Sequence, residues 1–151
     1  MNRKNEIIPI FFSIDDGYAP FLSVALASII QNASDAYDYR ATVLCNDLSE
    51  QNRQRLSALA TDHFEIQFVP MGTRLDHIKD RIGNRLRADY FTLTIFFRLF
   101  IPAMFPEYDK AIYLDSDIVV PGDISELYRT ELGDNLIAAA ADHSVVGVPP
   151  F

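Results

Sequence analysis

The sequence has one cysteine, Cys45, among its 151 residues, and its acidic residues outnumber its basic ones. A single cysteine excludes an internal disulfide and a cysteine zinc site, so a reducing compartment fits best. With 13 Lys and Arg against 21 Asp and Glu, the formal net charge is −8. Without a basic field the chain has nothing to attract a nucleic-acid backbone, which excludes nucleic acid as the main partner. No hydrophobic run approaches the length of a transmembrane helix.

Two further patterns are missing. The N-terminal segment carries Arg3 and Lys4 before an apolar run, but that run contains Pro9 and ends without a small-residue cleavage site, so it does not predict a secretion signal. We therefore expect a cytoplasmic protein, with the inner face of the membrane as one option. The sequence also has no G-x-x-x-x-G-K and no G-x-G-x-x-G loop. Any bound phosphate must then be held by a metal and arginine rather than by a backbone cradle.

The order of apolar runs and helical patterns predicts one doubly wound α/β domain with a mostly parallel sheet over residues 1–151. The first apolar run is typical of a central strand, and the third predicted strand alternates as an edge strand does. The chain ends at Phe151 without a closing helix, so we expect the front part of a longer protein. Strands are predicted over 7–14, 40–45, 64–69, 111–114 and 136–141, and helices over 21–30, 50–60, 75–82, 92–104 (buried, with its end kinked by Pro102) and 124–129.

The stretch 111–120 contains the strongest chemical signal. A short apolar run, predicted to be a strand buried on both faces, delivers Asp115 and Asp117 on either side of Ser116. In an extended chain residues i and i+2 point to the same side, so the two carboxylates can converge. Two like charges that close cost several kcal/mol unless a proton or a cation relieves them. Carboxylate oxygens suit magnesium or manganese, so we predict a divalent metal here.

Other strand ends also present carboxylates, namely Asp15 with Asp16, and Asp142. Ligands of open α/β sheets bind beyond the carboxyl ends of the strands, although Asp is also a common turn former there. Arg98 is the one charge in the apolar segment 92–104. Two interpretations stay open for it: its stem packs while its head reaches water, or its guanidinium faces the same crevice and holds a phosphate, a sugar hydroxyl or an aspartate.

Together these residues resemble glycosyltransferase family 8, the retaining transferases of GT-A fold that include bacterial lipopolysaccharide galactosyl- and glucosyltransferases. The resemblance runs from Ile7 to about Asp142. It rests on four segments in order, which are 13–18 (Ser-Ile-Asp-Asp-Gly-Tyr), 46–49 (Asn-Asp-Leu-Ser) with the following Asn52, 97–99 (Phe-Arg-Leu) and 113–117 (Tyr-Leu-Asp-Ser-Asp). The last is the D-x-D motif of the family.

The resemblance implies a Rossmann-like nucleotide-sugar-binding fold and transfer of a hexosyl group from a UDP-sugar to a glycan or lipid-linked acceptor with retention. It implies manganese, or magnesium, held by Asp115 and Asp117. The residues it places at the nucleotide are Ser13, Asp15 (accepting the uracil N3–H), Gly17, Tyr18 (stacking near the base), Asp115 and Ser116, and those facing the transferred sugar are Arg98 and Asp142.

Some parts of the family pattern are different or absent. Gly17 stands where some members have an asparagine that helps to hold the nucleotide. The third metal ligand of the family, a histidine in an H-x-x-G-x-x-K-P-W-like motif, and the segment near the anomeric carbon would come after Phe151. No catalytic nucleophile is indicated by spacing. We therefore expect the chain alone to bind donor weakly and to transfer nothing, with any peripheral membrane association made through the missing region.

Two alternatives from other classes remain. A haloacid-dehalogenase-type phosphohydrolase would use Asp115 as nucleophile and Asp117 as acid/base, but only 151 − 117 = 34 residues follow Asp117 and none is lysine. The other alternative is a non-catalytic module that binds nucleotide and metal, truncated or paired with a partner. Binding of UDP without turnover would distinguish this module from the transferase.

Overall fold

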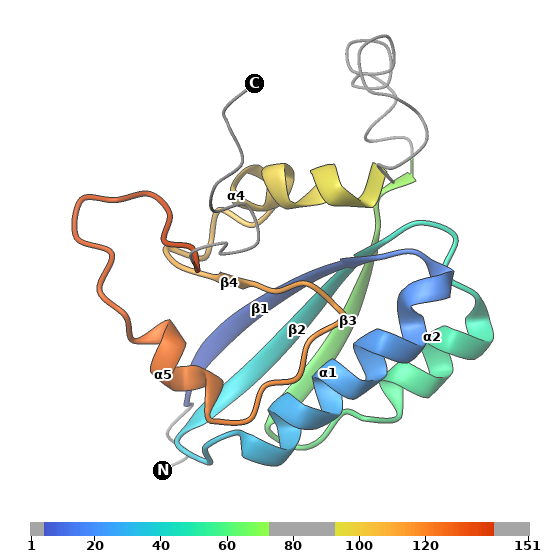
Figure 1. The fold of residues 1–151 in the computed structure, drawn as a ribbon, viewed down its shortest axis with the longest axis horizontal. Coiled ribbons are helices and arrows are strands. Elements are labelled where there is room, and N and C mark those ends of the chain that lie inside the picture. Colours follow the sequence, from blue (N-terminus) through green and yellow to red (C-terminus); the bar gives the residue numbers. More distant parts are fainter. Residues whose placement is uncertain (1–4, 73–92, 141–151) are drawn as a thin grey trace, which may run out of the picture.

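The fold is built on a four-stranded sheet, which Figure 1 shows at the centre of the computed structural model. The structure describes residues 5–72 and 93–140, so the predicted helix 75–82 and Asp142 lie outside the described residues. The strand order is β3-β2-β1-β4, and the three ladders between neighbours are parallel. The strands are β1 (Glu6–Ile14), β2 (Tyr37–Cys45), β3 (Phe64–Pro70) and β4 (Ile112–Tyr113). This confirms the predicted α/β fold, with β1 inside the sheet and β3 at an edge.

Helical segments cover the sheet on both sides (Figure 1). One face packs against α1 and α2, and the other packs against η3 and α4. In chain order the segments are η1 (Asp16–Tyr18), α1 (Ala19–Asn32), α2 (Glu50–Ser57), η3 (Leu93–Phe100), α4 (Ile101–Met104) and α5 (Ile124–Tyr128). None of the helices within the described ranges is long and apolar enough to cross a bilayer.

β1 forms the centre of the core because both of its faces are covered. Ile10 and Phe12 are fully buried toward α1. Phe11 points to the opposite face, where its ring centroid lies 4.9 Å from that of Phe105. Burying one such side chain contributes about 1.5–3 kcal/mol, so this short strand carries a large part of the apolar stabilisation. The continuous apolar run in the sequence is thus explained by coverage on both sides.

The helix starts follow from capping residues. Ser49 precedes α2, and its hydroxyl accepts a hydrogen bond from the Asn52 amide at 3.3 Å, as is typical of a serine at this position. Pro20 lies in the first turn of α1, where its missing N–H leaves no intrahelical bond unmade. Asp123 caps α5 in the same way as Ser49 caps α2, by accepting from the Ser125 amide. These local signals set where the helices begin.

The prediction of one buried helix over 92–104 is wrong. The segment is a 3-10 helix, η3, followed by the separate four-residue helix α4. Pro102 lies in the first turn of α4 and does not kink a helix end, because an N–H in the first turn has no intrahelical acceptor and its loss breaks no bond. Burial is also uneven: Phe97 is fully buried, whereas Leu99 is 69% exposed.

Two strand predictions need correction. The strand predicted over 111–114 is reduced to the two residues of β4, and Tyr113 and Leu114 are only half-buried because β4 is an edge strand. Residues 136–140 form no strand, and Leu136 and Ile137 are 96% and 81% exposed. An apolar run becomes a strand only where a neighbouring strand satisfies its backbone, and the described residues provide none beside this run.

Candidate functional site at the carboxyl edge of the sheet

The strand order reverses between β1 and β4, and the space beyond the carboxyl ends of these two strands is here called the crevice. From β1 the chain adds β2 and β3 on one side and then returns to place β4 on the other side. Open α/β sheets bind ligands at such a switch point, beyond the carboxyl ends of the strands. The loops that flank this point are residues 15–18, here called the β1 loop, and residues 115–117, here called the β4 loop. The site residues predicted on these two loops therefore meet at one edge.

The β1 loop is held in a tight turn. Asp15 accepts hydrogen bonds from the Tyr18 amide through its backbone oxygen and through Oδ1, each at 3.2 Å. A Cβ atom on Gly17 would lie 3.3 Å from Asp15 Oδ1, so a side chain here would crowd the carboxylate. The Tyr18 ring is 47% exposed and lies 5.6 Å from the ring of Phe21. The loop thus presents a fixed carboxylate beside an accessible aromatic face.

Asp16 does not point into the crevice with Asp15. Its Oδ1 accepts from the Ser49 amide at 2.8 Å and from Asn52 Nδ2 at 2.9 Å. The hydrogen bond from the Ser49 backbone, followed by those from the side chains of Ser49 and Asn52, lowers the pKa of Asp16. Sequence reasoning noted Asp16 and Asn52 separately but missed this contact, because the two residues are 36 positions apart.

Ser13 brings an unsatisfied polar atom to the base of the crevice. Its Oγ is buried and has no hydrogen-bond partner among residues 5–72 and 93–140. Such a hydroxyl costs about 1–3 kcal/mol if it stays unpaired. Ser13 lies two residues before Asp15 on the face of β1 that also carries Phe11. A polar ligand group or a water molecule at the crevice would satisfy it.

Arg98 lies on η3, and its guanidinium is placed beside the β4 loop. Its Nη2 lies 3.5 Å from Asp115 Oδ1, and its guanidinium carbon lies 4.4 Å from the centroid of the Tyr113 ring. The side chains of Arg98 and Asp115 are 39% and 64% exposed, so the pair is open to solvent. Arg98 therefore faces the carboxylates of the β4 loop and can reach a ligand there.

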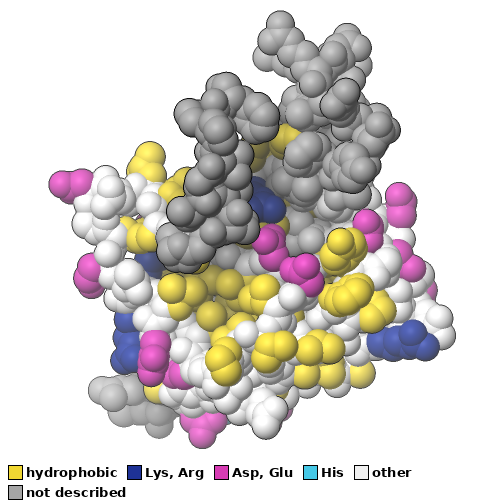
Figure 2. Space-filling model, in the orientation of Figure 1, with side chains coloured by type: hydrophobic (Ala, Val, Ile, Leu, Met, Phe, Trp, Pro, Cys, Tyr) yellow, Lys and Arg dark blue, Asp and Glu magenta, His cyan; other side chains and the backbone are white. Residues whose placement is uncertain are grey.

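The β4 loop presents two acidic side chains to solvent. Asp115 and Asp117 are exposed, whereas Ser116 between them is 5% exposed. The backbone bends at Ser116 and Asp117, so the convergence of the two carboxylates on one point stays a prediction. Within residues 5–72 and 93–140, no group of three or more His, Cys, Asp and Glu side chains is arranged to hold a metal. Figure 2 shows acidic side chains gathered near the middle of this face, next to a hydrophobic area.

The two carboxylates nevertheless fit a hard divalent cation. Such an ion accepts ligands from carboxylates, phosphates and water, and commonly takes only one or two from the protein. The exposed carboxylates of Asp115 and Asp117 can provide these two while the remaining positions stay open to a ligand. Asp142, predicted to face a sugar, lies outside the described residues and adds nothing to this test.

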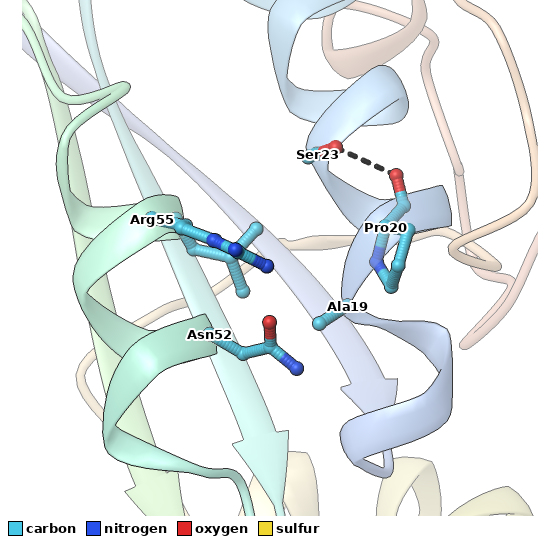
Figure 3. A pocket seen from close by; sticks show the side chains of 6 residues that line it. Ala19, Pro20, Ser23, Asn52 and Arg55 are labelled. Carbon is cyan, nitrogen blue, oxygen red and sulfur yellow. Dashed lines mark hydrogen bonds between the residues drawn. The ribbon is translucent and has the colours of Figure 1, made fainter.

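A hollow lies between α1 and α2, next to the β1 loop (Figure 3). Its volume is about 230 Å³, and none of the predicted site residues lines it. Arg55 and Asn52 enter it from α2, and Ala19, Pro20 and Ser23 line it from α1. The Ser23 hydroxyl donates to the Pro20 carbonyl at 2.6 Å. The chemistry-bearing carboxylates are therefore gathered at the carboxyl edge and not in this hollow.

The parallel sheet with flanking helices is Rossmann-like, as in glycosyltransferases of the GT-A fold. The model of the family described as "Glycosyl transferase family 8" matches residues 9–149. The chain belongs to this family. This membership decides against the phosphohydrolase alternative.

Relatives agree with the family assignment. The chain is 26% identical to a putative glycosyltransferase of Haemophilus influenzae, over 91% of this chain and 40% of the relative. Among solved structures, the bifunctional glycosyltransferase WbbM aligns with a TM-score of 0.76 and 32% identity, over 96% of this chain and 25% of that one. The galactosyltransferase LgtC, solved with donor and acceptor sugar analogs, gives 0.73 and 30%, over 91% and 48%. The chain thus spans less than half the length of these proteins.

Proposed function

We propose that this chain forms the donor-binding part of a hexosyltransferase that uses a UDP-sugar and manganese, or magnesium, and retains the anomeric configuration. The acceptor would be a glycan or a lipid-linked sugar, and the reaction would take place in the cytoplasm, at the inner face of the membrane where the acceptor is lipid-linked. The observation that carries the proposal is the pair of exposed carboxylates, Asp115 and Asp117, beside the switch point between β1 and β4.

The metal end of the proposed site is the β4 loop. Family 8 transferases are generally metal-dependent, and Asp115 and Asp117 would supply two oxygen ligands. A bound divalent ion neutralises charge on a diphosphate and makes the nucleotide a better leaving group. The chain itself has a net charge of −8, so it would repel an anionic donor without such local help.

Arg98 would work beside the metal. Its guanidinium is 3.5 Å from Asp115 in the structure and rests on Tyr113. When a cation takes over the carboxylate, the guanidinium is available to donate to a phosphate or a sugar hydroxyl. Asp142, on the same predicted edge, is proposed to contact the transferred sugar.

The base end of the proposed site is the β1 loop. Asp15 would accept the N3–H of uracil, and the exposed ring of Tyr18 would stack near the base. Gly17 leaves room beside that carboxylate. The buried hydroxyl of Ser13 and the backbone at Ser116 would line the space between the base and the diphosphate.

Calorimetric titration with UDP tests this proposal. We expect binding in the presence of manganese and a loss of that binding with EDTA. A parallel assay for sugar transfer separates a complete transferase from a module that binds without turnover. No binding of UDP at any manganese concentration, together with hydrolysis of an aryl phosphate in magnesium, would contradict the proposed function.

A further inference from the structure

The β1 loop is attached to the start of α2 by one pair of side chains. Asn52 Nδ2 donates to Asp16 Oδ1 at 2.9 Å and lies 3.3 Å from the Asp16 backbone oxygen. The Ser49 amide donates to the same carboxylate oxygen at 2.8 Å. Both the side chain and the backbone of Asp16 are therefore fixed by residues that follow β2.

The place of this contact in the fold gives it a consequence for the site. Ile14 and Cys45 are partners at the ends of the neighbouring strands β1 and β2, so the chain leaves both strands side by side. Asp15 directly precedes Asp16, and Gly17 and Tyr18 directly follow it. A backbone held at position 16 therefore limits how far Asp15 and Tyr18 can move. The contact acts on the base end of the crevice and is separate from Asp115 and Asp117.

The hydrogen bonds of Asp16 tie its carboxylate to the start of α2. Its Oδ1 takes both hydrogen bonds from the α2 side, and these bonds favour the ionised form. Charge-assisted bonds of this kind are about twice as strong as neutral ones. Asp16 is thus placed to orient its neighbours in the β1 loop.

We propose that Asp16 and Asn52 are positioning residues that hold Asp15 and Tyr18 in the conformation that receives the nucleotide base. This inference rests on the proposed function, because it assumes that the β1 loop binds the base. It predicts that breaking the contact weakens binding at the base end and leaves the metal and diphosphate end unchanged.

The sharpest test exchanges the two side chains. Asn52→Asp places a second carboxylate against Asp16, and we expect UDP affinity in manganese to fall at least about 10-fold, the size expected for a lost hydrogen bond to a charged group. Asp16→Asn should have a smaller effect, because an asparagine can still accept from Ser49. The double variant D16N/N52D restores a donor opposite a carboxylate, and we expect it to recover most of the affinity lost in Asn52→Asp.

The ligand comparison separates positioning from a general loss of structure. Methylenediphosphonate resembles the diphosphate of UDP but has no base. In manganese, the affinity of each of the three variants for this compound should stay within about 2-fold of that of the unmutated chain, because the substitutions remove no hydrogen bond to it. Gln54→Ala is the matched control, because Gln54 lies on α2 and its side chain donates to Glu50, at 3.0 Å, instead of to the β1 loop. Equal losses for both ligands, or no loss for either, would overturn the inference.

Hydrogen exchange at the Tyr18 amide gives a readout that needs no ligand. This amide donates to Asp15, so it should be protected in the unmutated chain, exchange faster in Asn52→Asp and be protected again in the double variant. Unchanged exchange in Asn52→Asp would overturn the inference while leaving the proposed function standing. If the Tyr18 amide exchanges faster in Asn52→Asp but the unmutated chain does not bind UDP, the contact holds the loop and the proposed function is contradicted. The role of the β1 loop in binding a base is then contradicted as well.

Discussion

The β1 loop and the β4 loop leave neighbouring strands at the same edge, but they are held in different ways. The β1 loop is tied to itself by Asp15 and to α2 by Asp16. The β4 loop carries two exposed carboxylates, and the contact resolved for Asp115 is a 3.5 Å ion pair with Arg98 that solvent reaches. We infer that the β1 loop has its binding conformation before a ligand binds. The β4 loop, in contrast, needs a bound cation to reach its binding conformation.

The largest expected effect concerns the strand on which both loops depend. Phe11 is fully buried on β1, and its neighbour across the ladder, Tyr113, leads directly to the β4 loop. Phe11→Ala should lower the free energy of unfolding by about 3–5 kcal/mol, as for other buried phenylalanines, measured by urea denaturation. Phe21→Ala, at a 54% exposed position, should cost less than about 1 kcal/mol. Equal costs would contradict the packing described for β1.

The next effect addresses the β4 loop alone. Asp117→Asn removes a proposed metal ligand, and we expect UDP affinity in manganese to fall about 100-fold or more, because even residues behind the ligands cost 10–100-fold. Its unfolding free energy should change by less than about 0.5 kcal/mol, since Asp117 is exposed. Asp134→Asn, an exposed position that loses the same charge, is the calorimetric control. Unchanged UDP affinity in Asp117→Asn would contradict metal binding by the β4 loop.

A smaller effect is expected from Arg98. Arg98→Ala should destabilise the fold by less than about 1 kcal/mol, because the ion pair with Asp115 is partly exposed. It should weaken UDP-sugar binding by about 10-fold, the value of a hydrogen bond to a charged group. Lys110→Ala is matched to it, because Lys110 lies 4.8 Å over the Tyr128 ring and precedes β4, at the other end of that strand. An equal loss of UDP-sugar affinity in both variants would show that binding depends only on the net charge of the chain and not on the position of Arg98.

The smallest effect is a pH dependence that separates the two loops. The hydrogen bonds from Ser49 and Asn52 lower the pKa of Asp16 below its usual 3.8 in the folded state. Its contribution to stability is therefore present above the unfolded pKa and is lost as the pH falls through the folded one. The unfolding free energy should decline between about pH 5 and pH 2, and less steeply in Asp16→Asn. If the unfolding free energy of Asp16→Asn depends on pH as steeply as that of the unmutated chain, the stabilising role of the Asp16 hydrogen bonds is contradicted.

The sequence predicted most of the elements on the α1 and α2 face and fewer on the other face. Strong local signals marked the first group, namely the apolar run of β1, Pro20 and the Ser49 cap. The segment 92–104 has apolar residues at a spacing that a 3-10 helix and an α-helix share over one or two turns, so its division was not predictable. The apolar run 136–140 has strand-like composition, yet pairing depends on neighbours that composition cannot supply.

For the candidate site, residue types were predictable and contacts were not. Asp115 and Asp117 were predicted as a pair of carboxylates after the strand, and both are exposed. The approach of Arg98 to Asp115 was one of two interpretations, because 17 residues and two elements separate them. The contact between Asp16 and Asn52 was missed, since a hydrogen bond across 36 residues leaves no pattern in a single sequence.

The most direct test asks whether one ligand spans both loops. NMR spectra of the chain with UDP and magnesium, and then with UDP and manganese, report on the two ends at once, because manganese broadens nearby signals. We expect UDP to shift the amide signals of Asp15, Gly17 and Tyr18, and manganese to broaden those of Asp115, Ser116 and Asp117 most strongly. Shifts confined to the hollow between α1 and α2, or no broadening at residues 115–117, would contradict a shared nucleotide and metal site at the carboxyl edge.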